Sequence, residues 1–392
     1  MNPIRINFTG CALMDKIYPD ISFRSEKFRK YASLAEGDGG LSPGKLVFSE
    51  EIEKFSGQKI QSIIGELTGN SIPLRSNIGG PAIVPAIHTS QLLGNRAEVK
   101  YFGAIGKDPI AGEFLELLQK TPLSKQNLLI LDGQSPFTDV LTDPSFDRGH
   151  GERCFINNIG VAWNYLPESI PDHFFDADIV CFGGTALVPE IHDHLNDLLE
   201  KAIHRNCFTI VNTVYDFRNE KEKPGKPWPL ADGRNINLLI MDSEESLKIS
   251  GTTTIPDASE FFISRGYKSF IITNGSRDII SYSSGEKNKG TILYYPVSNM
   301  VKDLIERKEY TGDTTGCGDN FCGGVIYSIA SQFAKNNSGI PDMEEAIVWG
   351  IASGGFACSY MGGCYFEEKA YEKKNLISEI VANYRKQTGI AE

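Results

Sequence analysis

The chain has 392 residues, of which 41% are hydrophobic and 23% are charged, and its formal net charge is −11. A chain of this length and apolar content can bury a large globular core, in one domain or in several. The acidic balance argues against nucleic acid or an anionic membrane as the main partner and is typical of a soluble surface, although a local basic site for a phosphorylated ligand is compatible with it.

Short apolar runs alternate with helical patterns along most of the sequence. In chain order, the predicted strands are Ile4–Thr9, Val99–Ala104, Ile179–Phe182, Phe208–Asn212, Asn237–Met241, Ser269–Thr273 and Ile279–Ser283. The predicted helices are Pro81–Leu93, Gly112–Gln119, Pro189–His204, Asp319–Phe333, Met343–Tyr360 and Glu367–Tyr384. Several strands are apolar at consecutive positions, which is typical of a parallel sheet covered on both faces. The alternation predicts βαβ units in a three-layer α/β/α sandwich.

Lys16–Ser76 departs from this alternation, because it is long, polar and punctuated by glycine. A structureless loop of that size is unusual inside a compact domain, so we predict an appended element that forms part of a lid. Phe137–Thr142 and Arg153–Asn157 are rich in β-formers around a glycine-containing turn at Arg148–Glu152, and we expect them to add strands to the lid. The prediction is a single domain over residues 1–392, with lid elements within about 16–76 and 136–158.

The spacing of the cysteines and histidines gives no sign of a metal site, and the distribution of apolar residues indicates where the protein is located. The eight cysteines form no CxxC pair, so nothing suggests a zinc or dithiol motif. His192 and His194 would point to different faces of a helix, and we expect both to be solvated. Met1–Gly10 does not resemble a secretory signal, and no run approaches the roughly 18 apolar residues of a membrane span. We therefore predict a cytoplasmic protein with no membrane partner.

The segment Thr311–Gly324 is the strongest candidate for chemistry. Gly316 and Gly318 stand just before a predicted helix, where glycine lets the backbone approach a ligand and free N–H groups point at it. Such a helix start favours an anion by roughly 0.3–1 kcal/mol when exposed and by up to about 2 when partly buried. Asp319 could simply cap this helix, but a plain cap needs neither the spaced glycines nor the Thr-Thr pair before them. Phosphoryl transfer needs donors around the moving phosphate and a base against the attacking hydroxyl.

Two common nucleotide-binding motifs are excluded. The chain contains no GxxxxGK[ST] loop, and Phe321 occupies the position of the third glycine of a dinucleotide fingerprint. The segment does resemble the Asp-Thr-x-Gly-Ala-Gly-Asp signature of the ribokinase-like carbohydrate kinases, the phosphofructokinase B family. The matching residues are Asp313, Thr314, Thr315, Gly316, Cys317, Gly318 and Asp319, with Cys317 in place of alanine. The resemblance implies a mainly parallel sheet with a small β-rich lid, and ATP-dependent phosphorylation of a sugar or sugar-like small molecule with Mg2+.

Further matches to this family follow in chain order. On the substrate side, Asp15 at the end of the first strand would bind hydroxyl groups, and Gly79 and Gly80 would precede a substrate-side helix. Phe102–Asp108, followed by Gly112, resembles the Gly-x-x-Gly-x-Asp-x-x-Gly run of the family. Simpler roles are open for each: Asp15 as a turn former, and the glycine pair as the start of a helix.

On the nucleotide side, Met241–Glu245 resembles the family's Asn-x-x-Glu element. Asp242 and Glu245 would bind the cofactor there, with Glu245 orienting magnesium through water, although ordinary first-turn helix charge also explains it. Thr273 and Gly275 resemble a Thr-x-Gly turn that meets the nucleotide, and Thr314 is assigned to the same side.

The resemblance also implies a separate role for each group at the reaction centre. Asp319 would accept the proton of the attacking hydroxyl, and the backbone N–H groups of Gly316, Cys317 and Gly318 would hold the developing charge. Many relatives bind a monovalent cation such as K+ beside this anion hole, and Asp313 and Thr315 lie in the matching region together with the loop at 359–364. Asp313 is equally compatible with a loop cap.

Two departures leave the acceptor open. Val84 stands where many relatives carry a substrate-binding asparagine, and the family's Asp-x-Asn-x-Arg run becomes Asn212–Asp216 followed by Arg218. Asn157 would supply a replacement substrate contact, as would Asn158, although turn residues are the simpler reading of both.

Three functions compete at this point. The first is a sugar or sugar-acid kinase. The second is a nucleoside kinase, for which Phe23, Phe28 and Tyr31 could form an aromatic platform or could equally be core. The third is a non-catalytic ligand-binding relative. Lid sheets of this family often pair between subunits, which suggests a homodimer through the lid.

Overall fold

The computed structural model describes residues 3–35, 37–146, 152–285, 290–310, 312, 314–335 and 340–391. In these ranges the larger sheet has nine strands in the order β14-β13-β12-β11-β10-β9-β1-β5-β6. Their bounds are β1 Ile4–Gly10, β5 Ala97–Ile105, β6 Leu128–Ile130, β9 Ile179–Gly183, β10 Phe208–Asn212, β11 Leu238–Asp242, β12 Ser269–Thr273, β13 Ile279–Ser283 and β14 Thr291–Tyr295. All neighbours from β6 to β12 pair in parallel, and β13 and β14 continue antiparallel.

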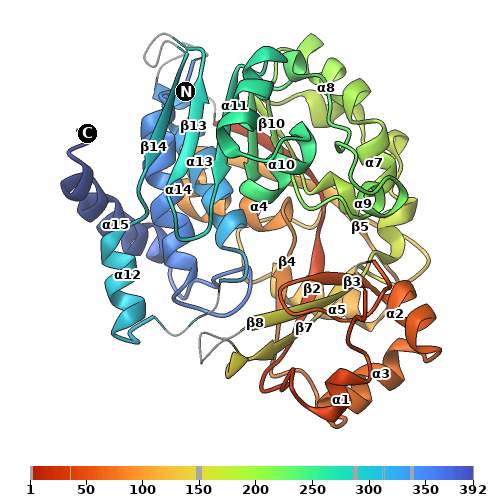
Figure 1. The fold of residues 1–392 in the computed structure, drawn as a ribbon. Helices are drawn as coiled ribbons and strands as arrows, with labels where there is room; N and C mark the ends of the chain where they lie inside the picture. Colours follow the sequence, from red (N-terminus) through yellow and green to blue (C-terminus); the bar gives the residue numbers. More distant parts are fainter. Residues whose placement is uncertain are drawn as a thin grey trace.

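Helices cover both faces of this sheet (Figure 1). One layer holds α4 Ile83–Leu93, α5 Pro109–Leu118, α13 Cys317–Lys335, α14 Met343–Ala357 and α15 Glu372–Thr388, with α12 Asn299–Glu306 packed against α15. The other holds α7 Pro189–Asp193, α8 Leu195–His204, α9 Phe217–Glu222, α10 Ser243–Ser250 and α11 Ile255–Ser264. The predicted three-layer α/β/α sandwich with a mainly parallel sheet is confirmed.

Strand β9 shows why these strands are apolar at every position. Ile179 and Cys181 belong to the hydrophobic cluster on one face of the sheet, whereas Val180 and Phe182 belong to the cluster on the other. Because successive side chains point to opposite faces of a strand, a sheet with two covered faces needs an apolar residue at each position.

A smaller sheet forms the lid, at the bottom of Figure 1. Its strand order within the described ranges is β3-β8-β7-β2-β4. The bounds are β2 Leu13–Tyr18, β3 Leu46–Phe48, β4 Arg75–Gly79, β7 Phe137–Asp143 and β8 Glu152–Asn158. Three short helices accompany it: α1 Glu26–Arg29, α2 Ser49–Ser56 and α3 Ile60–Thr68. The turn predicted at Arg148–Glu152 lies almost entirely outside the described residues.

The lid has its own hydrophobic core. Phe23, Phe28 and Tyr31 are buried there with Ile52 and Leu141, and the rings of Phe23 and Phe28 stack with centroids 4.5 Å apart. These aromatic side chains pack inside the lid, so of the two predicted roles it is the core role that the structure shows. They are therefore not an exposed platform for a base.

Several predicted boundaries differ from the structure. The helix predicted over Pro189–His204 is two helices, α7 and α8, because His194 leaves helical geometry at φ −106 and ψ 16. The last helix begins at Glu372 rather than Glu367, after Tyr371 in the left-handed region. In the part of the chain that the structure describes, no helix is long and apolar enough to span a membrane.

Candidate active site

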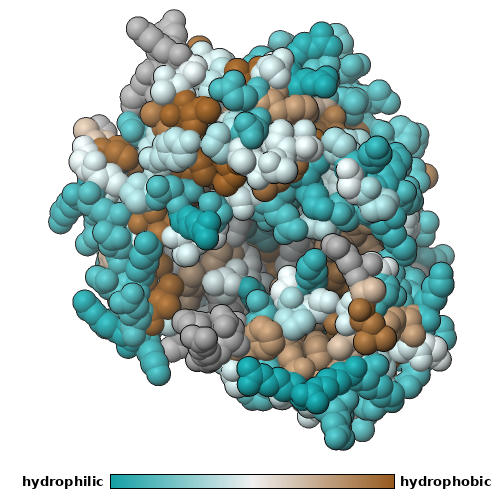
Figure 2. Space-filling view, viewed as in Figure 1, coloured by the Kyte–Doolittle hydropathy of each residue, from teal (hydrophilic) through white to brown (hydrophobic). Residues whose placement is uncertain are grey.

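The predicted site residues lie around a hollow between the lid and the larger body. In Figure 2 the surface is recessed between these two parts. The chain passes directly from β1 of the body to β2 of the lid, and Gly10 makes this transition with φ +128. A side chain there would collide with the carbonyl oxygen of Gly183 on the neighbouring strand β9. The carboxyl end of the parallel sheet, where α/β proteins bind ligands, therefore faces the lid.

The loop before α13 holds the predicted anion hole. The helix begins at Cys317, so Asp319 lies in its first turn. Gly316 has φ +74, and a Cβ there would lie 2.7 Å from the Cα of Gly363, so glycine allows the two loops to approach this closely. A Cβ at Gly318 would meet nothing within 4 Å, which leaves the backbone there accessible.

The lid contacts this loop through Arg153 of β8. Its guanidinium donates hydrogen bonds to the hydroxyl groups of Thr314 and Thr315. The backbone N–H of Cys317 donates to the carbonyl of Thr314 at 3.3 Å, so that predicted donor is already engaged within the loop. Asp313 lies outside the described residues. Nothing in the sequence marked Arg153 as part of the site, since it lies about 160 residues before the loop.

The Asp319 side chain is only partly exposed. Protein surrounds most of it, and this burial raises its pKa to about 7. Burial also raises the pKa of Cys11, and the nearby charges of Asp319 and Asp15 raise it further. Both carboxylates therefore lie close to Cys11. A carboxylic acid with a pKa near 7 exchanges its proton at neutral pH, which suits a general base.

A buried polar network lies directly behind the anion hole, and sequence reasoning missed it. Asn320 donates from Nδ2 to the carbonyls of Gly316 and Gly363, at 2.8 Å each. Its Oδ1 lies 2.7 Å from His88 Nδ1 and accepts from Lys373 Nζ at 3.1 Å. The asparagine thus fastens the two loops together. Its position next to Asp319 is the only sequence signal that it had.

Lys373 is fully buried in this network, with 1% of its surface exposed. Its ammonium also donates to Gln91 Oε1 at 3.0 Å. Burial lowers the pKa of Lys373 to about 7 and also lowers that of His88. Two basic groups with weakened basicity therefore orient Asn320 from inside the protein core.

On the substrate side, the structure brings Asp15 and the glycine pair together. Asp15 on β2 is buried and pairs in register with Asn77 on β4. A side chain at Gly79 would collide with the Asp15 carboxylate, so glycine leaves room for it. Gly80 has φ +116, and a Cβ there would lie 2.6 Å from the Cys11 carbonyl oxygen. Val84, at the position of the missing asparagine, is buried in the core.

On the nucleotide side, Asp242 caps α10 and forms a reciprocal capping box with Glu245. Glu245 Oε2 accepts from the Asp242 N–H at 3.0 Å and from the Thr213 hydroxyl at 2.6 Å. Burial raises the pKa of Glu245 to about 8, with further contributions from the charges of Asp242 and Asp319. Glu245 therefore caps the start of α10 and also lies near enough to Asp319 for the two charges to interact.

The remaining predicted residues are placed as follows. Thr273 ends β12, and Gly275 follows in a turn with φ +58. Asn157 and Asn158 both lie in β8 and not in a turn, so the simpler reading is wrong for both residues. Asparagine is common in turns, so the sequence alone does not distinguish an asparagine in a turn from one on the face of a strand that lines a cleft.

The prediction for the histidine pair is half wrong. His194 is exposed, as expected, but the His192 side chain is only 11% exposed. Its Nδ1 lies 3.0 Å from Thr185 Oγ1 and its Nε2 lies 3.3 Å from Asp216 Oδ2. The two side chains point to different faces, and His192 lies on the face of α7 that is turned toward the protein. Across the described ranges, no cluster of three or more His, Cys, Asp or Glu side chains could hold a metal ion by itself.

The strand order and the covering helix layers define a ribokinase-like α/β fold. The chain belongs to the family described as "pfkB family carbohydrate kinase", whose model matches residues 72–370. No curated protein matches the chain.

Solved structures share the fold over nearly the whole chain. An adenosine kinase from Schistosoma mansoni in complex with 2-fluoroadenosine is 15% identical with a TM-score of 0.68, and the match covers 93% of this chain and 97% of that one. An adenosine kinase from Sinorhizobium meliloti is 17% identical with a TM-score of 0.65, covering 95% and 99%. A ribokinase from Thermotoga maritima is 13% identical with a TM-score of 0.61, covering 97% and 100%.

Proposed function

We propose that the protein is an ATP-dependent phosphotransferase that phosphorylates a hydroxyl group of a sugar or sugar-containing small molecule. The observation that carries this proposal is the Asp319 carboxylate in the first turn of α13, with a pKa raised to about 7. Membership of the pfkB family supports the reaction type. The similar folds of ribokinases and adenosine kinases support an acceptor that contains a sugar.

In the proposed reaction, Asp319 accepts the proton of the acceptor hydroxyl as its oxygen attacks the γ-phosphate of ATP. The proton moves to the carboxylate, the new O–P bond forms, and ADP leaves. Asp15, which lies with Asp319 near Cys11, holds a second hydroxyl of the acceptor. General-base catalysis of this kind contributes roughly 10²- to 10⁴-fold in rate.

The start of α13 stabilises the charge of the transferred group. The backbone at Gly316 and Gly318 would supply N–H donors, and the positive end of the helix dipole adds to them. The Cys317 N–H would join them only by leaving the Thr314 carbonyl. Arg153, bonded to Thr314 from the lid, brings a fixed positive charge to the same loop.

The carboxylates of Asp242 and Glu245 fit a divalent cation. Burial raises the pKa of Glu245, so an uncompensated negative charge is unfavourable there and a bound cation would offset it. Bound Mg2+ would neutralise the charge of the ATP phosphates. Thr273, Gly275 and Thr314 are proposed nucleotide contacts. A monovalent cation at Asp313 and Thr315 stays a prediction, because Asp313 lies outside the described residues.

The test is a transfer assay on the full chain with ATP, Mg2+ and a panel of free sugars and nucleosides. We expect ADP release that depends on one class of acceptor, together with a phosphorylated acceptor detected by mass spectrometry. ADP release that no acceptor increases would contradict a small-molecule kinase. It would favour the non-catalytic alternative if acceptors still stabilise the protein against heat.

A further inference from the structure

We propose that Cys317 and Cys358 are a site of reversible oxidation, and that the disulfide between them stops phosphoryl transfer by fixing the loop before α13. The formation of this bond does not depend on the proposed function, whereas its effect on turnover does. The distance between the two sulfurs, the exposure of the cysteines and the backbone contacts of the loop carry the inference.

The two thiols meet where α13 begins and α14 ends. The two helices pack against each other (Figure 1), with Cys317 as the first residue of α13 and Cys358 as the C-cap of α14. Their Sγ atoms are 3.5 Å apart, although the residues are 41 positions apart in the sequence. A disulfide is about 2.05 Å long, so the sulfurs need to approach each other by roughly 1.5 Å.

The backbone also brings these two helix ends together. A Cβ at Gly354 of α14 would lie only 3.0 Å from the Cys317 carbonyl oxygen. Glycine therefore lets the start of α13 rest directly on the last turns of α14. This close approach places the Cys317 side chain beside Cys358.

Exposure distinguishes the same two cysteines from the others. All eight cysteines lie in the described ranges as free thiols, and six of them are buried. Cys317 and Cys358 are the two that are partly exposed. Burial raises the pKa of each of the six buried thiols, so they stay protonated at neutral pH and do not supply the thiolate that reacts with an oxidant.

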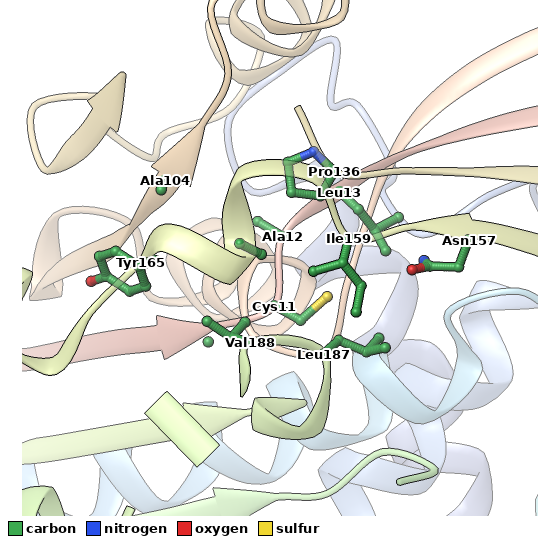
Figure 3. A pocket seen from close by; sticks show the side chains of 12 residues that line it. Cys11, Ala12, Leu13, Ala104, Pro136, Asn157, Ile159, Tyr165, Leu187 and Val188 are labelled. Atoms are coloured by element: carbon green, nitrogen blue, oxygen red, sulfur yellow. The ribbon is translucent and has the colours of Figure 1, made fainter. Parts of the chain in front are cut away.

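Cys11 is the other thiol near the reaction centre, and its surroundings do not favour a disulfide. It lines a small pocket where β1 passes into the lid, and none of the other described residues that line this pocket is a cysteine (Figure 3). Burial raises its pKa, and the charges of Asp319 and Asp15 raise it further. Oxidation near the site therefore falls on Cys317 and Cys358.

The disulfide ties the loop before α13 to Cys358 at both ends. At the start of the loop, the Gly312 N–H already donates to the Cys358 carbonyl at 3.1 Å. At its end, the new bond joins Cys317 to the same residue. The Cys317 N–H donates to the Thr314 carbonyl at 3.3 Å inside this loop, and it has to leave that carbonyl to reach a phosphate. The crosslink opposes this movement.

The lost movement sets the size of the effect. One backbone donor fewer around the transferred group costs roughly 10²- to 10³-fold in kcat when the donor belongs to an oxyanion hole. We therefore expect the oxidised protein to turn over at least about 10-fold more slowly than the reduced protein.

The oxidant in this reaction is a hydroperoxide such as hydrogen peroxide. One thiolate attacks a peroxide oxygen, so that an S–O bond forms, the O–O bond breaks and one water leaves. The second thiolate attacks the oxidised sulfur, the S–S bond forms, and the second water leaves. The two sulfurs together lose two electrons to the peroxide oxygens, and the two thiol protons end in the two waters. A dithiol reverses the reaction by thiol–disulfide exchange and is itself oxidised.

The test treats the full chain with hydrogen peroxide and follows two readouts. Mass spectrometry of the alkylated and digested protein should show peptides joined through Cys317 and Cys358. Turnover with ATP, Mg2+ and the best acceptor of the panel should fall at least about 10-fold, and dithiothreitol should restore it.

Three variants make the test specific. Cys317→Ala carries the alanine of the family signature and cannot form the bond, and Cys358→Ala removes the other sulfur. Each should lose less than about 2-fold relative to its own untreated form. The matched control is Cys207→Ala, which removes a buried thiol that donates to the Phe175 carbonyl at 3.2 Å. It should lose activity on oxidation as the wild type does.

The outcomes separate this inference from the proposed function. Absence of the joined peptides, pairing of either cysteine with a different one, or inactivation that persists in Cys358→Ala would overturn the site. A complete disulfide that leaves turnover unchanged would overturn its effect on the loop. Joined peptides in a protein that phosphorylates no acceptor would support the disulfide and overturn the proposed function instead.

Discussion

Replacing Lys373 by methionine is expected to change stability in opposite directions at low and at high pH. Burial lowers the pKa of Lys373 from 10.5 to about 7. One pKa unit corresponds to about 1.36 kcal/mol, so the buried ammonium costs the native state roughly 5 kcal/mol below pH 7. The unfolded chain keeps this proton up to about pH 10.5, whereas the native state releases it near pH 7. The free energy of unfolding of the wild type therefore rises with pH across this window.

Methionine removes that cost but leaves polar groups without a donor. Gln91 Oε1 loses its bond to the ammonium, and Asn320 Oδ1 keeps only His88. Buried acceptors left unpaired cost roughly 1–3 kcal/mol. Lys373→Met should therefore be more stable than the wild type by roughly 2–4 kcal/mol near pH 6, and less stable above about pH 9.

The assay is urea unfolding of both proteins between pH 6 and about pH 9.5. Lys374→Met, at the neighbouring and partly exposed lysine, is the control and should show no crossover. A difference between Lys373→Met and the wild type that stays constant over this range would refute the reasoning, because the native lysine would then keep its proton throughout, as the unfolded chain does.

Three further outcomes follow from the site. Because Asp319 must be ionised to act as a base and its pKa is about 7, kcat/KM should rise with pH through about 7, and a flat profile would contradict its role. The pKa of Glu245 is raised from 4.5 to about 8, so the unfolded chain loses this proton at lower pH than the native state does. The free energy of unfolding therefore falls as the pH rises from about 4.5 to 8. Glu245→Gln should unfold less readily than the wild type at pH 9 without Mg2+, by at least about 1 kcal/mol, and should need roughly 10-fold more Mg2+ for turnover. Gly80→Ala should lower the free energy of unfolding by about 3 kcal/mol or more. Its φ of +116 alone costs a non-glycine residue about 1–3 kcal/mol, and the collision with the Cys11 carbonyl adds to that cost. The control Gly112→Ala lies in helix α5 with open space around it, and should be neutral or stabilising by about 0.4–1 kcal/mol in thermal unfolding.

The fold class could be predicted because its signals are local. Runs such as Ile179–Phe182 are apolar at every position since both faces of the sheet are covered, and each predicted strand of the larger sheet is present. The short lid helices α2 and α3 were not predicted. Helices of this length depend on tertiary packing, here against the lid core through Ile52 and Ile63, and not on their own propensity.

In the candidate site, too, the residues with local sequence signals could be predicted, and those positioned by distant contacts could not. Gly316 and Asp319 could be found because a glycine turn and a helix start are adjacent in sequence. Lys373 could not, since it begins a charged helix that is typical of a solvated surface, and its burial depends on Gln91 and Asn320, both distant in sequence. Asn157 was predicted as a substrate contact, but its strand register and unpaired oxygen come only from the folded lid.

The role of Asp319 is tested most directly by measuring phosphoryl transfer and nucleotide binding in Asp319→Asn beside the wild type. Asparagine keeps the shape of the side chain but cannot accept the proton, so binding of a non-hydrolysable ATP analogue should stay within about 3-fold while kcat falls by roughly 10²- to 10⁴-fold. Turnover within a few-fold of the wild type would contradict Asp319 as the base, and with it the mechanism proposed for this cleft.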